Sequence, residues 1–187
     1  MKATYLSLAL LAVLSMAACT SSQSETPSAT AGDAYKDVNN IYTIYIMPVE
    51  LPDDIHGNAS DEEKERWQED WQMVGARLIA RGVTDEAGDS VASSAREEKP
   101  DADYYFTLTI TYLDVGDADV RSAGLLDSDE RGWSHVLAVG RIVRSDNGDT
   151  VAELTFDQSS GKFTKEPFQN DMSNLGTELG SWIVERK

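Results

Sequence analysis

Cysteine, proline and basic residues are scarce in this sequence, and the scarcity excludes several classes of protein. The chain has one cysteine, five prolines, and 16 lysines and arginines against 33 aspartates and glutamates in 187 residues. Its formal charge of −17 repels phosphate backbones, which excludes nucleic-acid binding. A single cysteine cannot form an internal disulfide or a thiolate metal site. Beyond the first twenty residues, no apolar run is long enough to span a bilayer, which excludes a polytopic membrane protein.

The first eighteen residues have the pattern of a secretory signal. Lys2 supplies a positive charge, and a short apolar segment over residues 6–14 follows it. The next residues, Met16-Ala17-Ala18-Cys19, resemble the lipobox of bacterial lipoproteins, with methionine where leucine is usual. The resemblance implies that Cys19 is acylated and becomes the amino terminus after cleavage. Two or more acyl chains anchor a protein stably to a bilayer. The alternative is an ordinary secretory signal followed by a chance cysteine.

The residues after the signal predict a tether and a location. Residues 19–36 are rich in serine, threonine and alanine, which predicts a flexible tether before one globular domain at 37–187. A flexible chain of this length holds a domain roughly 20–25 Å from the membrane on average. By resemblance to the sorting rule of Gram-negative lipoproteins, Thr20 in place of aspartate implies the outer membrane. We expect the domain to face the periplasm, with surface display as the alternative.

A long amphipathic helix is expected early in the domain. Ser60 and Glu63 form a capping box, and the apolar residues after it fall at helical spacing. The pattern predicts a helix over 60–81, with Gly82 as its C-terminal stop. Its apolar residues are Trp67, Trp71, Val74, Leu78 and Ile79. We expect the two tryptophans to lie in the core; the alternative is an exposed aromatic pair for sugar or partner contact.

Four segments have the composition of strands. Residues 41–49 are β-branched and aromatic on both faces, and residues 105–113 alternate. In the second segment Phe106, Leu108, Ile110 and Tyr112 are expected to share the buried face. Segments 136–143 and 151–156 flank Asn147-Gly148, the strongest short hairpin signal, which predicts an antiparallel pair.

Two further elements complete the expected order. Residues 90–98 are compatible with a short helix ended by Pro100, and Pro167 begins a terminal helix. The apolar stripe of that helix is Phe168, Met172, Leu175, Leu179, Trp182 and Ile183. Gly176 and Gly180 are expected to allow close approach to the sheet. The order β-α-(short element)-β-β-β-α predicts a single α/β (α+β) domain, with a mostly antiparallel sheet and helices packed on it.

Three weak motifs in this order resemble a group of envelope lipoprotein modules. The motifs are the strand entry Ala102-Asp103-Tyr104, the Asn147-Gly148 hairpin and the Leu-Gly-x-x-Leu-Gly of residues 175–180. Together with the lipobox they are similar to the amino-terminal domain of TolB, to CsgG-like lipoproteins and to uncharacterised members of that group. The resemblance covers about residues 40–185 and implies an envelope lipoprotein fold. Pore formation is not expected, because the chain has no long alternating membrane hairpins.

The segment 114–132 is the longest one without periodicity, and loops of this length are usually functional or disordered. With the residue that follows it, the segment supplies our candidate contact residues: Asp114, Asp117, Asp119, Arg121, Asp127, Asp129, Glu130, Arg131 and Trp133. A partner-contact loop, a plain solvated loop and a calcium site are the alternatives, although the acids lack the EF-hand spacing. Trp133 is expected either to pack or to lie at an interface.

The sequence offers little for catalysis. It lacks the G-x-S-x-G nucleophile motif, and Gly161-Lys162 does not complete a phosphate loop. His56 and His135 are the only histidines, which are too few for a zinc site without cysteine. We therefore expect no catalytic residue, no cofactor and no resident metal.

These observations predict a lipid-anchored binding or assembly module of the cell envelope. It is expected to act without catalysis, through contacts with an envelope protein at an exposed sheet edge and at the loop 114–132. The alternative is a ligand-binding lipoprotein that holds a glycan or a cation through Trp133 and the acidic loop.

Overall fold

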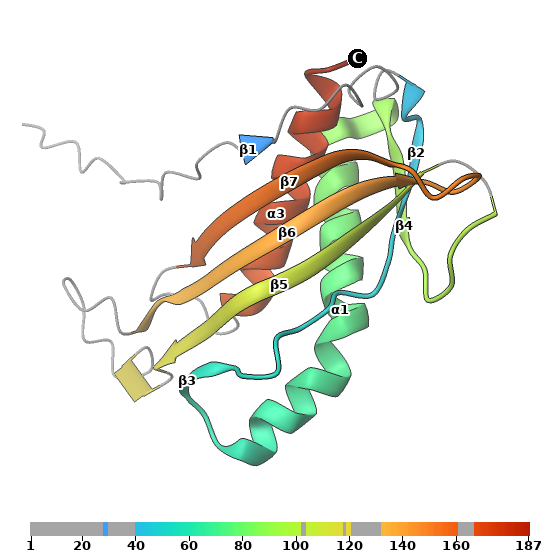
Figure 1. Cartoon of the computed structure of the whole chain (residues 1–187). Coiled ribbons are helices and arrows are strands. Elements are labelled where there is room, and N and C mark those ends of the chain that lie inside the picture. The colour runs from blue at the N-terminus through green and yellow to red at the C-terminus, as the bar shows by residue number, and fades with distance from the viewer. Residues whose placement is uncertain (1–27, 30–39, 102–103, 118, 121–131, 161–166) are drawn as a thin grey trace, which may run out of the picture.

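The chain folds into one α+β domain, as the sequence predicts. The computed structural model describes residues 28–29, 40–101, 104–117, 119–120, 132–160 and 167–187. Its strands are β1 (Ser28–Ala29), β2 (Thr43–Ile46), β3 (His56–Asn58), β4 (Ala92–Ala95), β5 (Tyr104–Asp117), β6 (Ser134–Arg144) and β7 (Thr150–Ser160). Its helices are α1 (Asp61–Ala87), the 3₁₀ turn η2 (Gly88–Ser90) and α3 (Pro167–Val184). Both long helices lie on the same side of the sheet (Figure 1).

The sheet is mixed, and its long strand pairs are antiparallel. The strand order is β1-β7-β6-β5-β2-β4, and β3 pairs with β5 beyond the end of β2. Strands β5, β6 and β7 form an antiparallel meander. Strand β2 pairs in parallel with β4 and with β5, and β3 also pairs in parallel with β5. The expected hairpin at Asn147-Gly148 is confirmed, with Gly148 at φ 78° in the turn.

Two residues of the predicted tether belong to the sheet. Ser28 and Ala29 pair antiparallel with Thr155 and Leu154 of β7. Cys19 and the other residues of the tether up to residue 36 lie outside the described residues. The pairing extends the sheet by one short strand along the edge of β7.

Helix α1 is longer than the sequence predicts. Its capping box at Ser60 and Glu63 is confirmed, but the helix runs on to Ala87 and ends at Gly88, whose φ is 55°. The predicted stop at Gly82 is therefore wrong. A Cβ at this position would stand 2.4 Å from the Ser173 carbonyl oxygen of α3, so Gly82 serves helix packing. The helix continues because its buried face still has α3 to contact.

The same close packing explains the glycines of α3. A Cβ at Gly176 would stand 2.3 Å from the Ile79 carbonyl oxygen, and one at Gly180 would stand 3.1 Å from the Val83 carbonyl oxygen. Both neighbours belong to α1. The expectation that these glycines approach the sheet is wrong, because the surface they approach is the backbone of the other helix.

The segment 90–98 forms the edge strand β4 instead of a short helix. Ala92 to Ala95 pair in parallel with Thr43 to Ile46 of β2. Ser93 Oγ also donates to the Ala80 carbonyl of α1 and lies 2.9 Å from Thr84 Oγ1. The helix prediction failed because pairing with β2 and contact with α1 satisfy this short polar segment in an extended form.

The core lies between the two helices and the sheet. Its largest fully buried side chains include Trp182, Phe106, Phe168, Ile44, Ile79 and Leu108. Trp67 and Trp71 are half-buried and pack against this core. Their rings stack on each other at 4.6 Å, and Trp71 stacks on Phe168 at 4.1 Å, so they continue the core toward the start of α1. Within the described ranges, neither helix is apolar enough over a sufficient length to cross a membrane.

Candidate interaction surface

The helices leave one face of the meander uncovered (Figure 1). We call this surface the open face. Register partners place side chains of the three strands in common rows across it. The open face consists of Tyr105, Thr107, Thr109, Tyr112 and Asp114 of β5; His135, Leu137, Val139, Arg141 and Val143 of β6; and Glu153, Thr155, Asp157 and Ser159 of β7.

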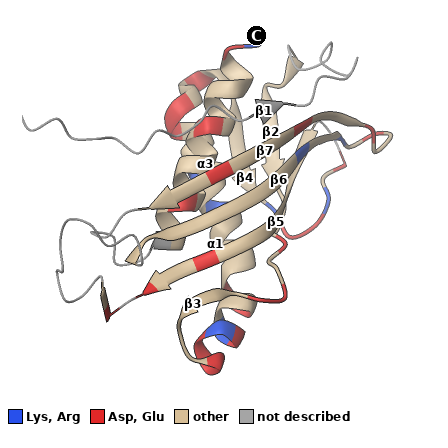
Figure 2. Cartoon of the chain, turned by 60° about the vertical axis from the view of Figure 1, so that its left-hand side comes forward, with Lys and Arg blue, Asp and Glu red and all other residues tan. Residues whose placement is uncertain are grey.

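The rows of the open face mix apolar, hydroxyl and charged side chains. The central row is Thr109, Val139 and Thr155. In the next row Arg141 Nε donates to Glu153 Oε2 at 2.8 Å, and both side chains are more than 40% exposed. Figure 2 shows the resulting pattern of acidic positions on β5 and β7 with a basic position on β6. A half-buried apolar centre with charged surroundings has the composition of a non-obligate protein interface.

A bulge in β5 brings Tyr112 to the open face. The register shifts between Ile110 and Tyr112, so that Thr111 is the additional residue. Tyr112 then pairs with Leu137 on the open face, and Leu113 turns into the core. The prediction that Tyr112 shares the buried face is therefore wrong, because a single inserted residue reverses the alternation.

Both histidines gather around Tyr112 at one end of the open face. The rings of His56 and Tyr112 stack with centroids 5.0 Å apart, and His135 meets Tyr112 edge-on at 5.7 Å. His135 Nε2 lies 2.8 Å from Asp157 Oδ1. Partial burial, and then the nearby Asp114 carboxylate, raise the pKa of the Tyr112 phenol. Sequence analysis did not predict this cluster, because its members come from four different strands, β3, β5, β6 and β7.

Two of the predicted contact acids accept hydrogen bonds from backbone amides. Asp114 Oδ1 accepts from the Gly116 amide at 2.7 Å. Asp117 Oδ1 accepts from the amides of Asp119 and Val120 at 2.9 and 3.2 Å. These carboxylates therefore shape the end of β5 where the long loop leaves the sheet. The other charged members of the set, Arg121, Asp127, Asp129, Glu130 and Arg131, lie outside the described residues.

Trp133 lies at the same end of the sheet and is half-buried. Its backbone is held close to β5, since a Cβ at Gly116 would stand 2.3 Å from the Trp133 carbonyl oxygen. Gly116 itself has φ 66°, a conformation that favours glycine. The structure thus brings Trp133 and Asp114 to one end of the open face, as the sequence grouped them.

Two carboxyls beneath the sheet, one fully buried and one half-buried, were not anticipated. Asp171 of α3 is fully buried and accepts from Ser134 Oγ at 2.6 Å and from Ser160 Oγ. Glu178 accepts from Gln158 Nε2. Burial raises the pKa of Asp171, and it raises the pKa of Glu178 to about 7. The available signal for Asp171 was an acid three residues after Phe168 on the apolar stripe of the helix.

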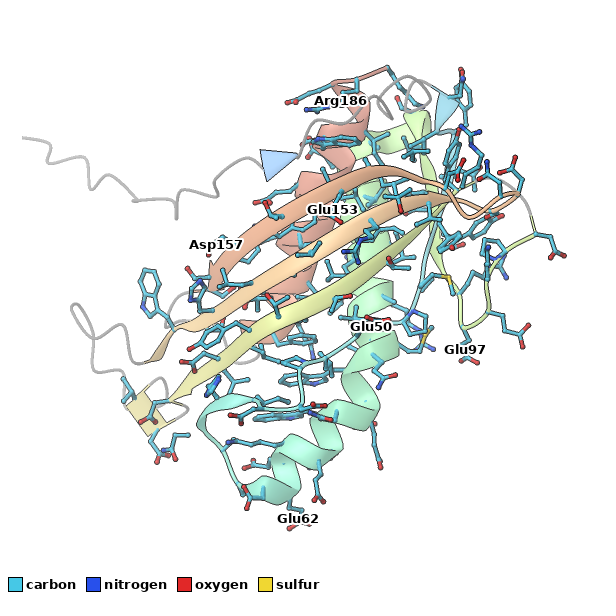
Figure 3. The ribbon with its side chains drawn as sticks, viewed as in Figure 1. Glu50, Glu62, Glu97, Glu153, Asp157 and Arg186 are labelled. Atoms are coloured by element: carbon cyan, nitrogen blue, oxygen red, sulfur yellow. The ribbon has the colours of Figure 1, made fainter. Side chains whose placement is uncertain are left out.

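A pocket of about 710 Å³ lies at the opposite end of the sheet, beside the edge strand β4. Tyr45, Met73, Arg77 and the segment 95–101 line it, and Trp133 does not. Figure 3 shows this separation: Glu97 lies beside β4, whereas Asp157 lies at the other end of the meander. Among the described residues, no group of three or more histidines, cysteines and acids has the arrangement of a metal site.

Solved structures with a similar backbone include lipoproteins. The PelC dodecamer from Paraburkholderia phytofirmans is 10% identical, with a TM-score of 0.46 over 82% of this chain and 97% of that one. Protein XCC0632 from Xanthomonas campestris is 11% identical, with a TM-score of 0.43 over 79% and 87%. Lipoprotein GNA1162 from Neisseria meningitidis is 13% identical, with a TM-score of 0.36 over 77% and 96%.

No protein-family model and no curated protein sequence matches the chain. The resemblance to the TolB and CsgG modules stays an expectation. At these low identities, the assignment of a function rests on the residues of this chain.

Proposed function

We propose that this protein is a lipid-anchored binding or assembly module of the outer membrane that contacts another envelope protein through its open face. Cys19 carries the anchor, and the domain faces the periplasm. The protein works without catalysis and without a cofactor. Its partner is a protein, because the open face offers a broad strand surface and the described pocket lies elsewhere.

The observation that best supports this proposal is that the two long helices lie on only one side of the sheet. On that side, α3 lies against β6 and β7, and α1 lies against β2 and β4 (Figure 1). On the other face, Leu137 and Val139 are half-buried and Val143 is buried, beside hydroxyl and charged side chains. Sheets that bury one face in a core and leave the other to solvent usually alternate apolar with polar residues. The apolar residues along β6 depart from that alternation, which favours a contact surface.

The chemistry of the cluster around Tyr112 also supports a binding role. His135 and Asp157 resemble a base and its orienting carboxylate, but within the described residues His135 hydrogen-bonds to Asp157 and to no hydroxyl or thiol. A nucleophile within hydrogen-bond reach is what such a pair needs for covalent catalysis. Stacked aromatic and imidazole rings are suited to recognition of a surface.

Affinity capture from crosslinked native membranes tests the proposal. The lipidated wild-type protein is compared with Val139→Arg, which places a charge at the centre of the open face, and with Asn174→Arg, which places the same charge on the exposed side of α3. We expect one envelope protein to be captured by wild type and Asn174→Arg and to be lost with Val139→Arg. Equal capture by all three proteins would remove the open face from the proposal.

A further inference from the structure

The pocket beside β4 concentrates positive charge in a strongly acidic chain. The protein has about two acids for every base, with 33 against 16. Even so, Arg77 of α1 and Arg96 and Lys99 of the β4–β5 connection all line this one pocket. All three side chains are exposed. Three basic residues from two separate elements therefore meet at a single hollow.

Tyrosine rings hold two of these cations in place. Tyr45 and Tyr105 are register partners on β2 and β5. The Arg96 guanidinium lies 5.3 Å from the centroid of Tyr45, and Lys99 Nζ lies 5.1 Å from the centroid of Tyr105. A cation–π contact orients a cation but does not neutralise its charge or use all of its N–H donors. Both groups thus remain able to donate to an anion.

The acids of the same segment do not neutralise these cations. Glu97, Glu98 and Asp101 also line the pocket and are exposed. Within residues 40–101, the ion pairs are Arg81 with Asp85 and His56 with Asp54, and none involves the three cations of the pocket. The pocket therefore presents separate positive and negative groups to its contents.

We propose that this pocket binds a small polyhydroxylated anion, such as a sugar that carries a phosphate or a carboxylate. Arg77, Arg96 and Lys99 hold the anionic group through charge-assisted hydrogen bonds. The carboxylates of Glu97, Glu98 and Asp101 accept from the hydroxyl groups of the same ligand. A volume of about 710 Å³ is within the range of small-molecule sites and accommodates one or a few sugar rings. The residues that line this site are not members of the open face, to which it is joined only through the contact of Lys99 with Tyr105, and the site does not involve the lipid anchor.

Titration calorimetry on the full chain in a nonionic detergent tests this site. The probes are glucose 1-phosphate, glucuronate and neutral glucose. At least one acidic sugar is expected to bind saturably while glucose does not, and added salt should weaken the binding. Binding of neither acidic sugar, together with no effect of phosphatidylglycerol in the micelles on the protein's melting temperature, would overturn the proposal.

Matched substitutions distinguish the pocket from general attraction of anions. Arg96→Gln and, on the other element, Arg77→Gln should each weaken binding about tenfold or more, the effect expected for loss of a charge-assisted hydrogen bond. Arg81→Gln removes the same charge from α1 outside the pocket and should leave the affinity within about twofold. Equal weakening by Arg81→Gln, or none by Arg96→Gln and Arg77→Gln, would contradict the assignment. Melting temperatures close to wild type verify that the variants are folded.

A second titration distinguishes a lipid headgroup from a soluble ligand. It uses micelles that contain phosphatidylglycerol, whose headgroup joins a phosphate to hydroxyls. Displacement of the sugar phosphate, or a rise in melting temperature that needs Arg96, identifies a lipid headgroup as the ligand. An unchanged affinity for the sugar phosphate identifies a soluble ligand.

Discussion

The backbone of α3 touches the backbone of α1 at Gly176 and Ile79, where a Cβ on the glycine would stand 2.3 Å from the Ile79 carbonyl oxygen. This contact sets the distance between the two helices and, with it, the depth of the core beneath the sheet. The atom that blocks the Cβ belongs to the backbone, so no side-chain movement can make room for it.

Gly176→Ala should therefore destabilise the domain. The usual gain in helix propensity is about 1 kcal/mol, whereas overpacking of a close contact costs about 1–3 kcal/mol and the helices must separate. Urea denaturation of the two proteins measures the difference. Asn174→Ala, on the exposed side of α3, is the control and should stay within about 0.5 kcal/mol of wild type. A Gly176→Ala protein as stable as this control would show that α3 does not touch the backbone of α1 at Ile79.

Asp171 should contribute to stability through its two serine partners. Asp171→Ala removes the acceptor for the Ser134 and Ser160 hydroxyls in a fully buried site, which should cost about 1–3 kcal/mol. Asp171→Asn retains an acceptor and should cost less. Thermal or urea unfolding at one pH ranks the stabilities of wild type, Asp171→Asn and Asp171→Ala. The reverse order of the two substitutions would contradict the hydrogen-bond arrangement.

Glu178 should make the stability depend on pH. Burial raises the pKa of Glu178 to about 7 in the folded protein, from the ordinary value of 4.5 that applies in the unfolded chain. Between these two values the folded state binds more protons than the unfolded state, so this group's contribution to the free energy of unfolding falls as the pH rises. The comparison of wild type with Glu178→Gln at pH 4.5 and pH 7.5 isolates this residue from the other acids. We expect wild type to lose more stability than Glu178→Gln over that interval; equal losses would show that Glu178 titrates normally.

Lipidation at Cys19 is tested by labelling cells with a radioactive fatty acid. The sequence Met16-Ala17-Ala18-Cys19 predicts label on wild type, and Cys19→Ala should be unlabelled and released from the membrane fraction. A Cys19→Ala protein with the same label would exclude this anchor. Fractionation of the wild type on a density gradient then tests the outer-membrane location.

The sequence predicted those parts of the fold that depend on local signals. The capping box at Ser60, the turn at Asn147-Gly148 and the stripe of α3 each specify an element through neighbouring residues. The errors arose where a distant element decides the outcome. The local pattern predicts a helix stop at Gly82, but packing against α3 explains this glycine instead. The alternation predicts a buried Tyr112, but the bulge in β5 moves it to the other face.

The candidate site was predicted only in part for the same reason. Asp114 and Trp133 lie at the same end of the sheet because they flank one loop, and their role in contact stays a prediction. The positions of His56 and Asp157 beside them depend on the register of β3 and β7, which no local pattern encodes. The pocket beside β4 was missed because its cations converge only after the sheet has formed.

Site-specific photo-crosslinking at Val139 tests whether the open face contacts another envelope protein. A photoreactive amino acid at this position lies in the middle row of the open face, and the same amino acid at Asn174 lies on the helix side. We expect a light-dependent adduct with one envelope protein from position 139 and none from position 174. A correctly anchored protein that forms no adduct at 139, or forms the same adduct from both positions, would contradict a contact role for the open face.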